Sequence, residues 1–155
     1  MYEPIRTKSV HSTMAGTTSD FPHRTREEEL DIQLAGHLAA LLAVTDELRA
    51  TTPSADLDAA AERLAGQLTR LRGGGAPARA AGTGEGRPSS LHLRAHALAG
   101  RALVVAASRA DTAVAILAAE RMDAHSAALA EAHSAAPVEP QAAAPAEPRE
   151  LTAAG

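Results

Sequence analysis

The sequence contains no cysteine and no tryptophan, and it has only one phenylalanine and one tyrosine. Without cysteine, the chain has no means of forming a disulfide, a thiolate metal site or a thiol nucleophile. Both aromatic residues, Tyr2 and Phe21, lie near the N-terminus. The core must therefore be built from Leu, Val, Ile and Ala, which bury little area each, so we expect a monomer of modest stability.

The chain also lacks a net positive charge and long uncharged apolar runs. The formal net charge is -4 at pH 7, which gives no electrostatic reason to expect nucleic-acid binding. The most apolar region, 95–119, still contains His96, Arg101 and Asp111, so we expect no membrane span. The first 24 residues contain no apolar run of the kind that acts as a secretion signal. We therefore expect a cytoplasmic location, with either Met1 or Met14 as the true start.

Three segments lack the apolar side chains that would offset the entropy cost of ordering them. Residues 1–24 are rich in Ser and Thr, residues 73–88 are rich in Gly, and residues 135–155 are rich in Pro and Ala. The glycines of the middle segment are not followed by the Lys-Ser or Lys-Thr of a phosphate-binding loop. We predict disordered tails at 1–24 and 135–155, and a flexible linker at 73–88 within one helical domain spanning 25–134.

Two helices are predicted before the linker. Thr25 followed by Glu28 matches a capping box, and leucines recur at intervals of three and four from Leu30 to Leu48. Thr52 and Pro53 are typical of the cap and first turn of a second helix, which continues to about Arg72. Because so few residues separate these helices, we expect them to form an antiparallel hairpin.

The segment from Ser90 to Ser134 contains no proline and one glycine, Gly100. Its many Ala, Leu and Arg residues favour helix, and one continuous helix would be about 66 Å long. We expect continuity, because Ser108 to Asp111 contains neither Gly nor Pro, which tight reversals usually need. Ser108 and Asp111 weakly resemble a capping box, so a reversal there is the alternative. The predicted fold is therefore all-α, a three-helix bundle with one long C-terminal helix, or a four-helix bundle if that segment breaks.

Large apolar residues fall on three faces of this segment, whereas the first two helices offer only two leucine stripes to cover them. The face left uncovered is formed by Leu93, Val104, Met122 and Leu129. Uncovered apolar patches usually mark interfaces. We therefore predict that the protein forms a homodimer, or binds a helical partner, through this face.

Histidines are the best candidates for chemistry. His92 and His96 have the spacing by which two imidazoles on a helix bind one metal, but no H-E-x-x-H motif surrounds them. His37 falls within the leucine stripe of the first helix, where a hydrogen-bonded core histidine is the more common explanation. In a continuous helix His96 and His125 would lie about 43 Å apart, whereas a reversal would make them neighbours.

No Glu-x-x-His pair, carboxylate pair or nucleophile motif supports a catalytic site in this sequence. We therefore predict a non-enzymatic helical interaction or scaffold module that self-associates through its long helix, with no cofactor. The alternative is a small metal- or ligand-binding bundle that uses His37, His92 and His96.

Overall fold

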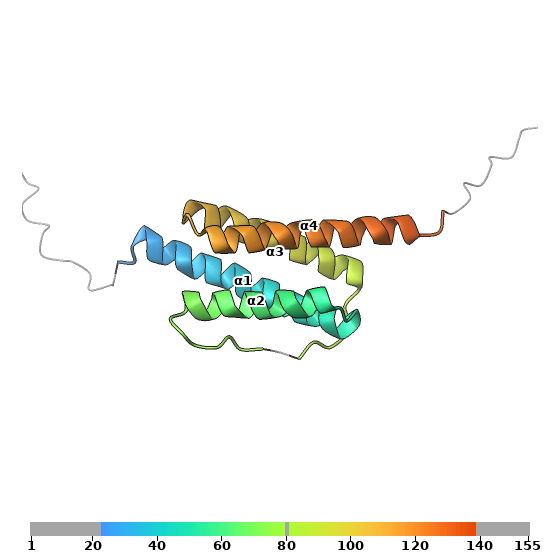
Figure 1. Ribbon diagram of the computed structural model, residues 1–155, viewed down its shortest axis with the longest axis horizontal. Helices are drawn as coiled ribbons and strands as arrows, with labels where there is room; N and C mark the ends of the chain where they lie inside the picture. The colour runs from blue at the N-terminus through green and yellow to red at the C-terminus, as the bar shows by residue number, and fades with distance from the viewer. Residues whose placement is uncertain (1–22, 80, 139–155) are drawn as a thin grey trace, which may run out of the picture.

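The computed structural model describes residues 23–79 and 81–138, which contain four α-helices. These are α1 (Arg26–Thr51), α2 (Ala55–Leu71), α3 (Pro88–Ser108) and α4 (Thr112–Ala135). α1 and α2 form one antiparallel layer, and α3 and α4 form a second layer against it (Figure 1). The all-α prediction is confirmed. Most of the tails predicted at 1–24 and 135–155 lies outside the described residues.

The first hairpin forms as its local signals predict. Thr25 Oγ1 accepts a hydrogen bond from the Glu28 amide at 3.1 Å, and the Glu28 carboxylate accepts one from the Thr25 amide at 2.8 Å. These two bonds complete the predicted capping box. α2 begins slightly later than predicted, because Ser54 rather than Thr52 caps it by accepting from the Leu57 amide at 3.2 Å.

The predicted continuity of 90–134 is wrong, because the chain reverses between α3 and α4. Ala110 adopts a left-handed backbone conformation, with φ of 52°. The Asp111 amide donates to the Ala106 carbonyl at 2.9 Å, and the Ala110 amide donates to the Ala107 carbonyl at 3.1 Å. These are the two hydrogen bonds of a Schellman motif, which normally has glycine at the left-handed position. The turn therefore forms without the residue from which it is usually recognised.

Tertiary contacts hold this reversal in place. The Arg109 guanidinium donates to both carboxylate oxygens of Asp31 in α1, at 2.9 and 3.2 Å. Asp111 accepts from Arg70 of α2 at 2.5 Å and also caps α4 by accepting from the Val114 amide at 3.2 Å. Contacts with both helices of the first layer thus offset the cost of a left-handed alanine.

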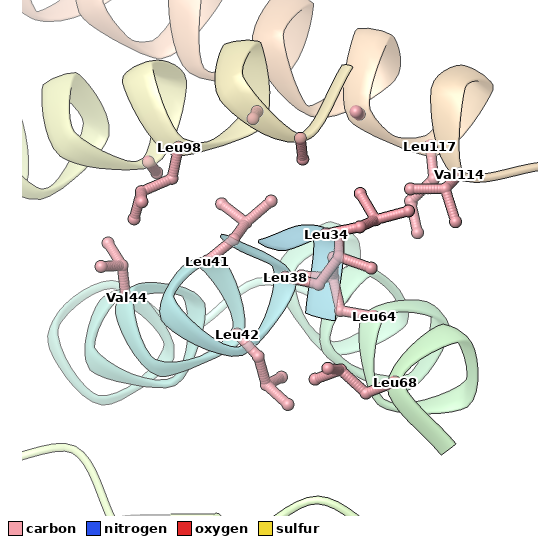
Figure 2. Packing of buried hydrophobic residues seen from close by; sticks show 14 of the residues in the cluster. Leu34, Leu38, Leu41, Leu42, Val44, Leu64, Leu68, Leu98, Val114 and Leu117 are labelled. Atoms are coloured by element: carbon pink, nitrogen blue, oxygen red, sulfur yellow. The ribbon is translucent and has the colours of Figure 1, made fainter. Parts of the chain in front are cut away.

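The core lies between the two layers (Figure 2). Leu34, Leu38 and Leu41 of α1 are fully buried, as are Leu64 and Leu68 of α2. They meet inward-facing residues of the second layer, which are Leu98, Val105, Val114 and Leu117 together with several alanines. Because alanines supply much of the second layer, the helices approach closely and bury little side-chain volume.

The linker after α2 lies along α1 and makes specific contacts with it. Arg79 donates to both carboxylate oxygens of Asp46, at 2.7 and 2.5 Å, and Thr83 donates to Glu47. Burial raises the pKa of Asp46, but Arg79 and Arg49 outweigh it and hold the pKa below its usual value. Gly82 lies so close to α1 that a Cβ atom there would be 2.7 Å from the Asp46 carbonyl oxygen. The linker's flexibility stays a prediction, and these contacts are expected to restrict it.

Within the described ranges, none of the helices has both the length and the apolar character that crossing a membrane requires.

Candidate functional site

The reversal brings two histidines together. His92 of α3 and His125 of α4 lie with their Nδ1 atoms 2.9 Å apart, and their ring centroids are 5.2 Å apart. His125 is 1% exposed, whereas His92 is half-buried. We call these two residues the histidine pair. It joins the N-terminal end of α3 to the second half of α4.

The tautomers of the histidine pair follow from its surroundings. One Nδ1 must donate and the other accept, since a neutral imidazole has one donor and one acceptor. Among the described residues, the buried Nε2 of His125 has no hydrogen-bond partner. A buried N–H without an acceptor costs about 1–3 kcal/mol. His125 therefore donates through Nδ1 and keeps only a lone pair at Nε2, while His92 accepts and carries its proton at the more exposed Nε2.

A buried arginine lies one helical turn before His125. Arg121 is 6% exposed, and its guanidinium donates to the two carboxylate oxygens of Asp56 at 2.9 and 3.0 Å. These hydrogen bonds hold the pKa of Asp56 below its usual value. Asp56 lies in the first turn of α2, where the helix dipole also favours a negative charge. The ion pair links α4 to α2 as the histidine pair links α4 to α3.

Both imidazoles are poor bases in this setting. Burial lowers the pKa of His125 to about 4, with further lowering from His92 and Arg121 and a smaller opposing effect from Asp56. Burial also lowers the pKa of His92. Both rings are therefore neutral at pH 7, which fits the N–H···N hydrogen bond between them.

A cavity of about 490 Å³ adjoins the histidine pair. Its walls come from the α1–α2 turn, the first turn of α2, the start of α3 and the second half of α4, and they include Leu57, Ser89, Ala128 and Glu131. Asp56 also lines it, and no Lys or Arg side chain is among the described residues that do so. Its titratable groups are thus carboxylates and the two neutral imidazoles.

The histidines predicted to bind metal do not form one group. His96 is half-buried one turn beyond His92, and His37 is half-buried on α1. In the described part of the chain, no three His, Asp or Glu residues are grouped so as to hold a metal ion. A metal on Nδ1 of His125 would also require a proton on its buried Nε2, where metal-binding histidines normally donate to a carboxylate or carbonyl. The metal-binding alternative stays a prediction that no grouping of these residues supports.

The four residues predicted to form an interface lie on the outer face of the α3–α4 hairpin, which we call the outer face. Leu93 is 60% exposed and Val104 is 67% exposed, whereas Met122 and Leu129 are half-buried. The Met122 side chain lies 3.7 Å from the position of a Cβ on Gly100, which fixes the register between the helices. In this antiparallel register Leu93 and Leu129 lie at the same level. The reversal therefore leaves much of the predicted face uncovered.

Comparisons with protein-family models, with curated protein sequences and with solved structures find no match to this chain.

The sequence did contain a signal for the polar contacts of α4 that our prediction missed. The buried residues of α4 are Val114, Leu117, Ala118, Arg121 and His125. Their spacing of three and four places Arg121 and His125 on the same inward stripe as the apolar residues. This spacing is the same whether or not α4 continues α3, because it depends only on the helical period.

Proposed function

We propose that this protein is a non-enzymatic helical interaction module that forms a homodimer through the outer face. The observation that carries this proposal is the exposure of Leu93 and Val104, at 60% and 67%. At 100° per residue these two side chains lie within about 20° of each other on α3. The half-buried Met122, which lies against Gly100 between them, adds apolar area from α4.

A second copy of the chain is the partner that we propose for this surface. Gly100 lies between Leu93 and Val104 on the same side of α3 and presents no side chain. The Met122 side chain of α4 lies against Gly100, so both helices contribute to the surface that a second copy would contact. Two copies related by two-fold symmetry would each cover the other's exposed Leu93 and Val104, so a single face serves both partners.

The non-enzymatic part of the proposal is supported by how the polar groups are already used. The two Nδ1 atoms of the histidine pair bond to each other, and the Asp56 carboxylate bonds to Arg121. The remaining nitrogen of His125 is buried. A general acid or base must reach the proton it transfers, and these groups would first have to give up their present partners.

Sedimentation equilibrium at micromolar concentration tests the proposal. We expect the unmodified chain to be a dimer and Val104→Glu to be a monomer, because a carboxylate in an apolar interface loses hydration without gaining a partner. Helical content, measured by circular dichroism at 222 nm, should be unchanged, since Val104 is exposed in the protomer.

Ile116→Glu is the matched control. Ile116 is an apolar residue of α4 that is 52% exposed, but it lies about 120° around that helix from Met122. It should leave the dimer intact. A monomeric unmodified chain, a dimeric Val104→Glu variant, or dissociation by Ile116→Glu would each refute dimerisation through the outer face.

A further inference from the structure

The inward stripe of α4 changes character along the helix. In its first half the buried residues are Val114, Leu117 and Ala118, which belong to the apolar core. Beyond them the buried residues of α4 are Arg121 and His125, and no residue from 126 to 135 is buried. The buried residues in the second half of α4 are therefore polar, while Met122 and Leu129 add half-buried apolar contacts.

Each of these polar contacts reaches a different helix. Arg121 bonds to Asp56 at the start of α2, and His125 bonds to His92 at the start of α3. The cavity beside the histidine pair separates the end of α4 from the α1–α2 turn, so little apolar contact supports the helix there. Losing the His92–His125 bond would leave the Arg121–Asp56 ion pair and the half-buried Met122 and Leu129 to attach this part of α4.

The histidine pair tolerates added protons poorly. Protonation of His92 at Nδ1 would turn that atom into a donor, which forces His125 to accept at Nδ1 and to carry its proton at the buried Nε2. Protonation of His125 also places an N–H at Nε2, where it has no acceptor among the described residues. The groups that face His125 are His92 and His96 from α3, Arg121 from α4 and Asp56 from α2, so one carboxylate opposes several basic groups.

We propose that the histidine pair is an acid-released contact that holds residues 121–135 of α4 against α2 and α3 when both rings are neutral. Protonation of either ring leaves an N–H at the buried Nε2 of His125 without an acceptor in the part of the chain that the structure describes, and protonation of both rings turns both Nδ1 atoms into donors, so the bond between them is lost. These changes free this half of the helix, while residues 112–118 stay anchored in the apolar core. Release would open the adjoining cavity and uncover Leu57. The device does not depend on the proposed dimer.

Hydrogen–deuterium exchange of the full chain at pH 7.5 and pH 5.0 tests this, with protection factors corrected for the intrinsic rates. The His125 pKa is about 4 in the closed state, against 6.5 for an ordinary histidine, so closure weakens as pH falls below about 6.5. Between these two pH values, linkage gives about a 30-fold loss of protection for amides 121–130. Asp56 stays ionised at pH 5.0, because its pKa lies below the ordinary value of 3.8.

Two variants sharpen the experiment. His125→Leu removes the titrating ring, so protection of 121–130 should change by less than about threefold between the two pH values. His133→Ala removes an exposed histidine from the last turn of the same helix and should behave like the unmodified chain. If His125→Leu loses as much protection as the unmodified chain, the histidine pair is not the cause and the proposal fails.

A nuclear magnetic resonance titration keeps the test independent of the variants. In the unmodified chain, protonation of the His125 ring and loss of protection in 121–130 should follow the same pH curve. Unchanged protection at pH 5.0, equal losses in all four helices, or two separate curves would each overturn the proposal. A loss confined to the second half of α4, tracking His125, is the result expected.

Discussion

Replacing Ala110 by glycine tests the reversal between α3 and α4 through the sign of a stability change. Ala110 has φ of 52° and occupies the position of the Schellman motif where glycine is usual. An alanine in this left-handed conformation costs about 1–2 kcal/mol, which glycine avoids. Glycine is also more flexible in the unfolded chain, which favours unfolding by about 0.4–1 kcal/mol and offsets part of this gain. We therefore expect Ala110→Gly to stabilise the protein by about 1 kcal/mol.

Urea unfolding followed by circular dichroism at 222 nm is the suitable assay, because the chain has no tryptophan to report by fluorescence. The free energy of unfolding typically falls by about 1–3 kcal/mol per molar urea, so the urea concentration at the unfolding midpoint should rise by roughly 0.5 M. The slope of the transition should stay the same, since the substitution changes no buried area.

Ala107→Gly provides a control of opposite sign. Ala107 is exposed in the last turn of α3, so glycine there should destabilise the protein by about 0.5–1 kcal/mol. If residues 90–134 formed one continuous helix, Ala110→Gly would destabilise the protein just as Ala107→Gly does. Equal destabilisation by the two substitutions would therefore refute the reversal.

Two further predictions concern the linker and the buried arginine. Gly82→Ala should lower the free energy of unfolding in urea by about 1–2 kcal/mol, because the added Cβ would lie 2.7 Å from the Asp46 carbonyl oxygen. Gly75→Ala, with open space around it, should be neutral or slightly stabilising, and equal effects of the two substitutions would show that the linker does not pack on α1. Asp56→Ala should lower the free energy of unfolding by about 2 kcal/mol, because it leaves Arg121 buried without its carboxylate partner. Arg121→Met should leave the stability nearly unchanged, and a larger loss from Arg121→Met than from Asp56→Ala would contradict this reasoning.

The structure of α1 and α2 follows from local features of their sequence. The Thr25 and Glu28 capping box, the leucine stripe and the short connection at Thr52 and Pro53 each act over a few residues, and the first hairpin forms as predicted. Helical spacing alone also places Leu93 and Val104 on one side of α3. These features depend on the period of the helix and not on what it contacts.

The histidine pair could not be predicted in the same way. His92 and His125 are 33 residues apart, and they meet only because α4 runs back along α3. In the predicted continuous helix, His92 and His96 would be remote from His125 and His133. The error in the predicted backbone therefore hid the histidine pair.

The sequence by itself determined that the chain is helical, where α1 begins and which faces of the helices are apolar, because capping and periodicity act within a few turns. The reversal at Ala110 was decided by the tertiary structure alone. An alanine disfavours the left-handed conformation locally, and the penalty is offset only when Arg109 reaches Asp31 and Asp111 reaches Arg70. Those partners lie in α1 and α2, far away in the sequence, so no local pattern reports them.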